Sequence, residues 1–552
     1  MEPSLPPATN SAAGSLPIGT ARYGVPSNAV YVTPGGANSG SGTLSAPYKS
    51  VQHAINKSPS GSTLVLRAGT YYESIFVPGG KKLTIQSYPG EAVWFDGSSR
   101  VTGFSKSGST WAVSNWNYDF DSRVSFNSNL DESHRFVDPA YPMAGHPDQV
   151  WINGVAQRQV GSASQVSAGS FFVDKKARRL VLGSDPTGKS VDASTLTKAI
   201  KVQGQGTTLR GFGVRRYATT VNMMGALSVE VANNTLENLV VTQNASVGVY
   251  AWGANNKFNK LTVSENGLMG GGANGANGLV VNQSKFVNNN TEKFKQAPVS
   301  GGLKVTKSDG IVVSHNVFEG STMGLWLDES VYDASVVGNV ARNNTRTGIL
   351  IELTEKAVVA NNYIVGNDRG LTIYNAGSIE VWNNTFSGNE RTLQFLQDSR
   401  RQTNSGLTNK IPWITRNVQL SNNVLSYGAG SCPVLTQDMS AVKYGNDFGI
   451  TFNANLYQRA SASAPANLAC WANGASGTRS FKTLALFKGH TGSDAGSAEL
   501  TGSPALSKDL ALTPAAAAAK GLSPRAIPAT IAAKIGVTAN TARTGALSAP
   551  IE

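Results

Sequence analysis

Two acidic residues hold the same place in neighbouring copies of one sequence phrase. In "GLWLDES" and "GILIELT", Asp328 and Glu352 each stand four residues after the opening glycine. Strand side chains alternate between two faces, so both acids are expected to point outward from a strand whose apolar residues point inward. Stacked strands lie about 4.8 Å apart, which places the two carboxyls roughly 5 Å apart, in the range that retaining glycosidases use.

A close pair of carboxyls can perform acid and base chemistry, because two neighbouring carboxyls do not both ionise easily. One of them is then protonated near neutral pH and acts as an acid, and the other acts as a base or nucleophile. The alternative is that Asp328 and Glu352 are simply solvated residues on the outside of a sheet. Directly stacked like charges destabilise a sheet, however, and aromatic residues flank this pair, which favours a catalytic role.

The same outward face is predicted to carry residues that bind substrate. Alignment on the repeated phrase puts five of them at outward positions, namely Tyr250, Trp252, Asn282, Trp326 and Tyr374. The aromatic rings would be platforms on which sugar rings stack. Packing of these rings against another part of the chain is the alternative.

Lys304 is expected on this face too, one unit before Trp326 and diagonal to Asp328. In a polysaccharide lyase, a Lys of lowered pKa can take the C5 proton of a uronic acid. Such an enzyme would also use Ca²⁺, held by clustered acids, to neutralise the uronate carboxylate. The plain alternative for Lys304 is a surface lysine.

These residues belong to a repeat that runs from about residue 205 to 430. Each copy has a hydrophobic triplet, then Asn, then a short loop and Gly, and the asparagines recur at spacings of 23, 23 and 22: Asn316, Asn339, Asn362 and Asn384. A unit this short cannot bury a face alone, so successive units must stack, each strand pairing with its copy in the next turn. This pattern predicts an all-β parallel β-helix with a buried, hydrogen-bonded asparagine ladder.

The rest of the chain is expected to cap or decorate this stack. The segment "YKSVQHAINKS" reads as a short amphipathic helix that covers the open edge of the first coil. The predicted parts are a flexible leader (1–28), an N-terminal cap with the first coils (29–104), a β-rich inserted lobe (105–200), the main coils with the active-site face (201–430), a Cys-containing region with the last coils (431–500), and a C-terminal cap and tail (501–552).

The phrases "SAPYKSVQHAI" and "GSTLVLRAGTYYESI", followed by the Asn-rich coils, resemble the pectin-lyase-like superfamily of secreted right-handed parallel β-helix proteins. The resemblance covers about residues 29 to 430, and residues 150–194 resemble the β-rich insertion of sugar-degrading members. The superfamily contains glycoside hydrolases, polysaccharide lyases and epimerases, so the resemblance implies a carbohydrate-active enzyme. The "GHG", "RIK", "WIDH" and "DPHD" patterns of its common subfamilies are absent, so no subfamily is assigned.

The composition limits the classes of molecule that the protein is expected to bind. A net charge of +13 at pH 7 favours polyanions, including acidic glycans. Nucleic acid is not expected, since no long basic run or recognisable binding module occurs. The chain contains no run of about 18 apolar residues, so no membrane span is predicted. The two cysteines, Cys432 and Cys470, are predicted to form a disulfide, which suits a secreted protein.

Three functions are compatible with these observations. The leading hypothesis is a secreted glycoside hydrolase that degrades a microbial or plant polysaccharide and needs no metal or other cofactor. The second is a Ca²⁺-assisted polysaccharide lyase with Lys304 as the base. The third is a non-catalytic glycan-binding β-helix. The sugar, the linkage, endo or exo action and the oligomeric state stay open.

Overall fold

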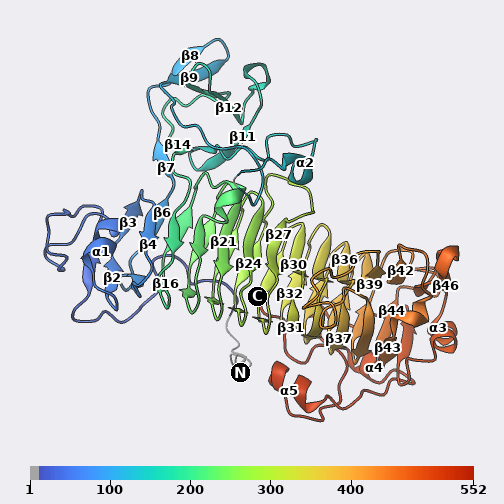
Figure 1. Cartoon of the computed structure of the whole chain (residues 1–552). Helices are drawn as coiled ribbons and strands as arrows, with labels where there is room; N and C mark the ends of the chain where they lie inside the picture. The colour runs from blue at the N-terminus through green and yellow to red at the C-terminus, as the bar shows by residue number, and fades with distance from the viewer. Residues whose placement is uncertain (1–11, 128) are drawn as a thin grey trace.

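The chain winds into a parallel β-helix, as the repeat predicted. The computed structural model describes residues 12–127 and 129–552. Three sheets of 13 strands each run the length of the stack (Figure 1). The first begins at β1 (Val30–Val32) and ends at β43 (Ile450–Asn453), and the second begins at β3 (Gly69–Tyr71) and ends at β47 (Ala498–Thr501).

The third sheet carries the outward positions of interest and is called the site sheet. Its strands, in spatial order, are β4 (Ile75–Val77), β15 (Ile200–Val202), β18 (Leu227–Val229), β21 (Val247–Trp252), β24 (Met269–Asn274), β27 (Gly301–Thr306), β30 (Met323–Asp328), β33 (Thr347–Glu352), β36 (Arg369–Tyr374), β39 (Arg391–Gln397), β42 (Val434–Asp438), β45 (Ala469–Ala472) and β46 (Thr478–Phe481). All neighbours pair in parallel except the last two strands, β45 and β46. The inward side chains, such as Leu327 and Ile351, are fully buried in the central core.

The asparagine ladder is present. Asn316, Asn339, Asn362 and Asn384 are each fully buried. The backbone N–H of Asn316 donates to Oδ1 of Asn339 at 2.9 Å, and Asn339 donates to Asn362 in the same way. Each amide side chain thus satisfies a backbone group at a bend of the chain.

A second asparagine ladder, which the repeat analysis did not identify, stands at another turn of the coils. Its members are Asn244, Asn266, Asn289, Asn344, Asn367 and Asn389, with Ser321 in the place of one Asn. All of them are buried. Two ladders therefore fix the geometry of successive coils, and this regularity sets the direction in which outward side chains point.

Short elements close the two ends of the stack. Helix α1 (Val51–Lys57) buries Val51, Ala54 and Ile55 against the first coil, as expected for a cap, and Ser50 caps its N-terminus. At the other end a disulfide joins Cys432 to Cys470, as predicted. The aromatic residues of α3 (Leu484–Thr491) and β46 pack there, with Phe487 fully buried.

The C-terminal tail contains α4 (Pro514–Ala517) and α5 (Ala529–Ile535). Helix α5 packs on the outer face of the first sheet, where Ile531 joins a cluster with Val358 and Trp382. The tail then returns along the stack, as drawn in Figure 1. The last strand of the coils, β47, ends at Thr501, which is the predicted start of the tail.

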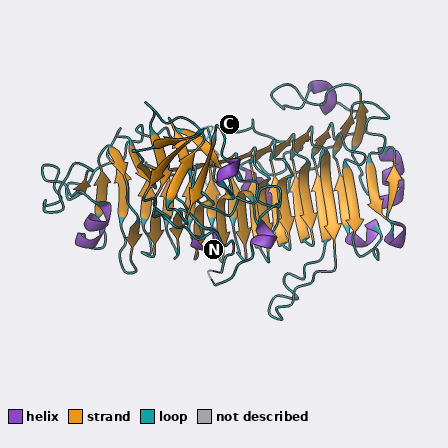
Figure 2. Cartoon of the chain, turned by 90° about the horizontal axis from the view of Figure 1, so that it is seen from above, coloured by secondary structure: helices purple, strands orange, loops and turns teal. Residues whose placement is uncertain are grey.

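The inserted lobe is an eight-stranded sheet that stands on the side of the stack (Figures 1 and 2). Its spatial order is β7 (Ser98–Arg100), β14 (Val191–Ser194), β10 (Val150–Ile152), β11 (Val155–Gln159), β12 (Ser170–Asp174), β13 (Arg179–Leu182), β9 (Thr110–Ser114) and β8 (Ser105–Ser107). It starts earlier than predicted, because residues 98–100 pair antiparallel with β14 instead of extending the first coils. Helix α2 (Ser133–Phe136) lies between lobe and stack.

The predicted flexible leader is not observed for residues 12–28. The N–H of Ala13 donates to the carbonyl of Glu552 at 2.7 Å, and the N–H of Ser15 donates to Oγ1 of Thr262 at 2.9 Å. Asn238 donates to the hydroxyl of Tyr23 at 2.6 Å. This segment is ordered because its polar groups find partners on the loops of the stack. The earlier part of the predicted leader, residues 1–11, lies outside the described residues.

Candidate active site

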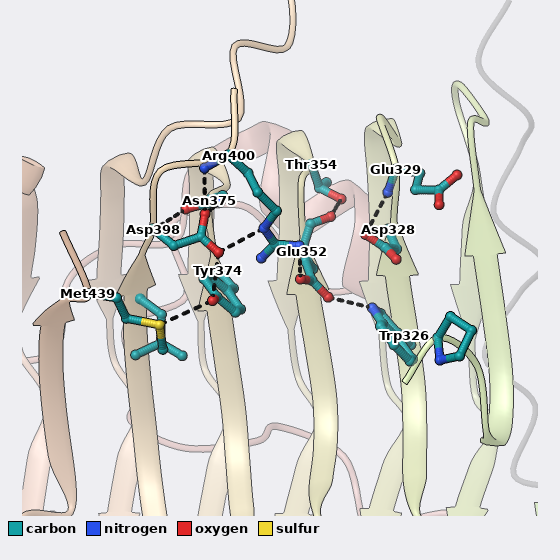
Figure 3. Close-up of polar contacts among 12 residues, drawn as sticks. Trp326, Asp328, Glu329, Glu352, Thr354, Tyr374, Asn375, Asp398, Arg400 and Met439 are labelled. Atoms are coloured by element: carbon teal, nitrogen blue, oxygen red, sulfur yellow. Dashed lines mark hydrogen bonds and ion pairs between the residues drawn. The ribbon is translucent and has the colours of Figure 1, made fainter. Parts of the chain in front are cut away.

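The stacked acids are neighbours in the structure. Leu327 of β30 pairs with Ile351 of β33, so the next residues, Asp328 and Glu352, lie side by side at the ends of adjacent strands (Figure 3). Each is only 6% exposed. They are therefore not solvated surface acids, because loops outside the repeat cover this part of the site sheet.

Glu352 is buried among groups that have opposing effects on its protonation. Trp326 donates its indole N–H to Oε2 of Glu352 at 3.0 Å, and an Arg400 nitrogen lies 2.7 Å from Oε1. Burial raises the pKa of Glu352 above its ordinary value, and the charge of Asp328 raises it further, while Arg400 opposes the shift. The net direction is upward, which suits a group that delivers a proton.

Asp328 has a different set of partners. Its Oδ2 lies 2.7 Å from the Lys304 ammonium, and its Oδ1 accepts the backbone N–H of Glu329 at 2.7 Å. The carboxylate charge is thus balanced at short range by a cation and a backbone donor. Each of the two adjacent acids therefore has a cation at 2.7 Å, Lys304 for Asp328 and Arg400 for Glu352. The pKa of Glu352 is raised in spite of its cation.

Lys304 is buried and does not behave as a surface lysine. Its Nζ donates to the carbonyl of Pro298 at 2.7 Å and lies 3.6 Å from the centroid of the Trp326 ring. Together with the ion pair to Asp328, these are contacts that an ammonium makes. The lysine is therefore placed to orient Asp328 and to balance its charge.

Arg400 was not identified from the sequence. It lies in the long loop between β39 and β40 (Arg416–Ser421), outside the repeat, and no pattern marks it. Its Nε lies 2.8 Å from Oδ2 of Asp398, and its guanidinium lies 4.6 Å from the Tyr374 ring centroid. Tyr374 also donates its hydroxyl to Asp398 at 2.8 Å, so this loop fixes both residues beside Glu352 (Figure 3).

A cavity of about 460 Å³ opens over these groups. It is lined by Lys304, Trp326, Asp328, Glu352, Tyr374 and Arg400, and further by Gln296, Pro298, Arg369 and Met439. A second cavity of about 730 Å³ shares Asp328, Glu329 and Arg400 with it and is walled by Tyr332 and Trp413. Asp328 thus lies at the border of two adjoining cavities.

The predicted binding residue Asn282 does not lie on this face. It ends β25 (Val280–Asn282) in the first sheet, where it accepts a hydrogen bond from Ser314 at 3.0 Å. Asn274 takes the expected position, since it pairs with Trp252 on one side and Thr306 on the other. The alignment failed here because strand β24 contains Gly270 to Gly272, whose missing side chains hide the hydrophobic pattern.

Tyr250 and Trp252 lie on the site sheet but not in the cavity. Their ring centroids are 4.5 Å apart, and both pack in a cluster with Phe136 and Val299 beneath the inserted lobe. Tyr250 is 6% exposed. The alternative role given to these aromatics, packing against another part of the chain, is the one that the structure shows.

Some further kinds of site are not found. Across residues 12–127 and 129–552, no group of three or more His, Cys, Asp and Glu side chains is arranged to hold a metal ion. Within the same residues, no helix is long and apolar enough to cross a membrane.

Comparisons with known proteins agree on the fold. The model of the family "Periplasmic copper-binding protein (NosD)" matches residues 271–427. Pectate lyase PEL9 of Emericella nidulans is 36% identical over 74 residues, which is 12% of this chain and 18% of that protein. The uncharacterized protein YwoF of Bacillus subtilis is 35% identical over 74 residues, 13% of this chain and 16% of that one. The chain thus matches less than a fifth of the length of these relatives.

Among solved structures, the complex of XylC with xylose superposes with a TM-score of 0.59 at 14% identity, and covers 78% of this chain and 83% of that one. At this identity the likeness concerns the fold. The fold of the chain is therefore a right-handed parallel β-helix, like that structure.

Proposed function

We propose that the protein is a glycoside hydrolase that cleaves a polysaccharide with Glu352 as the acid and Asp328 as the nucleophile. The observation that carries this assignment is the contrast within the pair. Burial and the charge of Asp328 raise the pKa of Glu352 in spite of its ion pair with Arg400 at 2.7 Å. The Asp328 carboxylate, in contrast, has both the Lys304 ammonium at 2.7 Å and the backbone N–H of Glu329 as partners. Two carboxyls in such different settings supply the two roles that glycoside hydrolysis needs.

The reaction would proceed in two steps. Glu352 protonates the glycosidic oxygen while Asp328 attacks the anomeric carbon, so the bond to the leaving sugar breaks as a glycosyl ester forms. Glu352, now ionised, then removes a proton from water, which attacks the same carbon and releases Asp328. Adjacent strands lie about 4.8 Å apart. This spacing fits the short separation of the two carboxyls in retaining enzymes better than the wider separation in inverting enzymes.

Neighbouring groups would support each step. Arg400 and the Trp326 indole bind the Glu352 carboxylate between the steps, and Lys304 balances Asp328 before attack. Tyr374, fixed by Asp398, lines the cavity beside them and offers a surface for a sugar ring.

The substrate would be a neutral or anionic glycan. The xylose bound to XylC makes xylosides the first substrates to test. The net charge of +13 extends the test to acidic glycans. The disulfide is consistent with an exported protein, so we propose that the enzyme works outside the cytoplasm.

A polysaccharide lyase with Lys304 as base is the second candidate, favoured by the short match to pectate lyase PEL9. The Nζ of Lys304 is already engaged by the Asp328 carboxylate, the Pro298 carbonyl and the Trp326 ring, so a substrate would have to displace these contacts before Lys304 could act on it. This weakens the lyase candidate. A non-catalytic glycan-binding protein is the third candidate, and it predicts binding without turnover.

Analysis of the reaction products distinguishes the three candidate functions. Xylan, cellulose oligosaccharides and polygalacturonate are incubated with the enzyme, with and without Ca²⁺, and the products are measured by mass spectrometry. Products that have gained water support hydrolysis. Unsaturated products that absorb in the ultraviolet would establish a lyase, and unchanged glycans that nonetheless bind would indicate a binding protein. A Glu352→Gln variant with wild-type hydrolysis would refute the assigned acid.

A further inference from the structure

Arg369 is a cation of the active-site cavity that has no close anionic partner. It is the first residue of β36 and lines the cavity together with Lys304 and Arg400. Lys304 and Arg400 each lie 2.7 Å from an oxygen of the carboxyl pair. Among the residues that the structure describes, the Arg369 guanidinium pairs with a single carboxyl, Asp368, at the longer distance of 3.7 Å, and its side chain makes no hydrogen bond.

Two more arginines lie beside Arg369. Arg391 of β39 is its register partner on the next strand. Arg346 precedes β33, and its backbone carbonyl accepts the N–H of Arg369 at 2.7 Å. Within the described part of the chain, Asp368 is the one carboxyl that forms ion pairs with these arginines, and it lies 3.9 Å from Arg346. Three positive charges therefore share one negative charge.

This cluster of arginines costs free energy in the absence of a further anion. Like charges directly opposite each other on adjacent strands destabilise a sheet. Burial lowers the pKa of Arg369, and the charges of Arg346 and Arg391 lower it further, whereas Asp368 opposes the shift. An arginine stays ionised in spite of such a shift, so Arg369 keeps a positive charge that one distant carboxyl does not fully balance.

The guanidinium of Arg369 indicates the chemistry of a ligand. It presents N–H donors in a planar fork that matches two oxygens of one anionic group. The side chain is 29% exposed, so an anion bound to it is partly shielded from water, which strengthens the attraction. A neutral hydroxyl accepts a hydrogen bond but leaves the charge unbalanced, and a cation is repelled.

The position of Arg369 shows which part of a substrate it meets. On β36 the cavity is lined by Arg369, at the start of the strand, and by Tyr374, at its end, which is the register partner of Glu352. Five residue steps of a strand separate these two backbone positions, which is about 16 Å. A group bound by Arg369 therefore belongs to a sugar unit beyond the one that reacts.

We infer that Arg369, with the charges of Arg346 and Arg391 beside it, binds an anionic group of the substrate, a carboxylate or a sulfate ester on a sugar unit. The inference rests on the proposed hydrolase function, because it assigns the specificity of that same cavity. It narrows the substrate from a neutral or anionic glycan to an acidic one.

The test compares oligosaccharides that differ in charge alone. Hexamers of galacturonate, glucuronate and mannuronate are each paired with their methyl ester, and a sulfated galactan hexasaccharide is paired with its desulfated form. All are titrated calorimetrically into full-length Glu352→Asp protein. The shorter acid is withdrawn from the scissile bond, which slows hydrolysis, and it keeps a carboxyl beside Arg400, so that no second cation is set free.

Arginine variants on this background locate the anion. They are Arg369→Met and Arg369→Lys. The control is Arg342→Met, which removes the same charge from β32 (Val340–Arg342), outside the cavity, where Arg342 pairs with Glu319 at 2.9 Å. Thermal melting verifies that each variant is folded, and the comparison of a charged hexamer with its uncharged form needs no arginine variant.

We expect at least one acidic hexamer to bind about tenfold or more tightly than its uncharged form, since a charged hydrogen-bonded pair is lost with the charge. Arg369→Met should lose this difference. Arg369→Lys should keep part of it, because the charge stays while the planar fork is lost, and Arg342→Met should keep all of it. The pair that shows the difference tells a carboxylate from a sulfate ester.

Equal binding of the charged and uncharged forms, no binding of any acidic hexamer, or the same loss in Arg342→Met would overturn the inference. Hydrolysis of neutral xylan by the unmodified protein, together with any of these results, would overturn the inference and leave the hydrolase in place. Arg369-dependent binding of an acidic hexamer that the unmodified protein does not hydrolyse would support the anion site and count against the hydrolase.

Discussion

Two regions of the site sheet have the same backbone and the same outward positions but different uses. At β21 the outward pair is Tyr250 and Trp252, and at β30 it is Trp326 and Asp328. The first pair is covered by the inserted lobe and closes a hydrophobic cluster. The second pair is covered by loops that leave a cavity and bring in Arg400 and Pro298.

The difference shows that the repeat determines the direction in which a side chain points, and that the covering segments determine what surrounds it. The coils and their two asparagine ladders present a side chain outward at each strand end, whatever its use. Whether that side chain packs or reacts depends on the segment that folds over it. We therefore expect a chemical role for the outward residues of β30 and β33 and a packing role for those of β21. Mutations can test both roles.

The largest effect is expected at the carboxyl pair. Asp328→Asn and Glu352→Gln should each lower kcat by about a thousandfold or more, because the amides keep the shape but lose the nucleophile and the proton. Substrate affinity should change little. Steady-state kinetics on the substrate identified by product analysis gives the values.

The control for this pair is Glu329→Gln. Glu329 lines the same cavity, but its carboxyl pairs with the exposed Lys307 at 3.2 Å. Near wild-type activity is expected. Activity that survives in both amide variants would mean that the outer face at β30 is no more catalytic than the face at β21.

The next effect concerns pH. Arg400 opposes the upward pKa shift of Glu352, so Arg400→Met should raise the pKa of Glu352 further. An acid works only while protonated, and activity is lost as pH rises through its pKa. The alkaline limb of kcat/KM should therefore move to higher pH, with kcat reduced by about tenfold because the ionised intermediate loses its partner.

Arg369→Met is the comparison for the pH profile. Arg369 lines the cavity as well, but it is not among the groups that shift the pKa of Glu352. The alkaline limb of kcat/KM for Arg369→Met should lie at the same pH as that of the unmodified protein. A downward shift in Arg400→Met would show that another group is the acid.

A smaller effect, on stability alone, is expected in the ladder. Asn339→Ala removes the amide that accepts the N–H of Asn316 and donates to the carbonyl of Val313 at 2.9 Å. The free energy of unfolding should fall by about 1 to 3 kcal/mol, because buried backbone groups are left unpaired. Denaturant titration measures this. An unchanged free energy of unfolding would show that the asparagine ladder does not stabilise the coils that carry β21 and β30.

The sequence was sufficient for the features that repeat. Period and alternation predicted the parallel β-helix, the buried asparagines and the stacking of Asp328 on Glu352, because each coil copies the hydrogen bonds of the last. The capping helix was predictable from its amphipathic pattern.

Several features that depend on tertiary contacts could not be predicted from the sequence. Arg400 lies in a loop whose path depends on tertiary contacts such as the hydrogen bond from Gln402 to Ser330 at 2.7 Å. Asn282 was misplaced because glycines in β24 left no pattern to align. The burial of Tyr250 depends on how the lobe docks, which no local signal in the strand encodes.

The smallest effect is expected at Trp252, the residue that tests the comparison most directly. Trp252→Leu should leave kcat and KM unchanged, since the ring packs on Tyr250 under the lobe, and should lower the free energy of unfolding by about 1 kcal/mol through lost apolar and ring contact. The matched change, Trp326→Leu, removes the indole N–H that Glu352 accepts at 3.0 Å and should impair catalysis. Kinetics and thermal melting of the two variants are compared side by side. Equal catalytic loss in both would mean that substrate reaches the face at β21, and that the lobe moves aside to admit it.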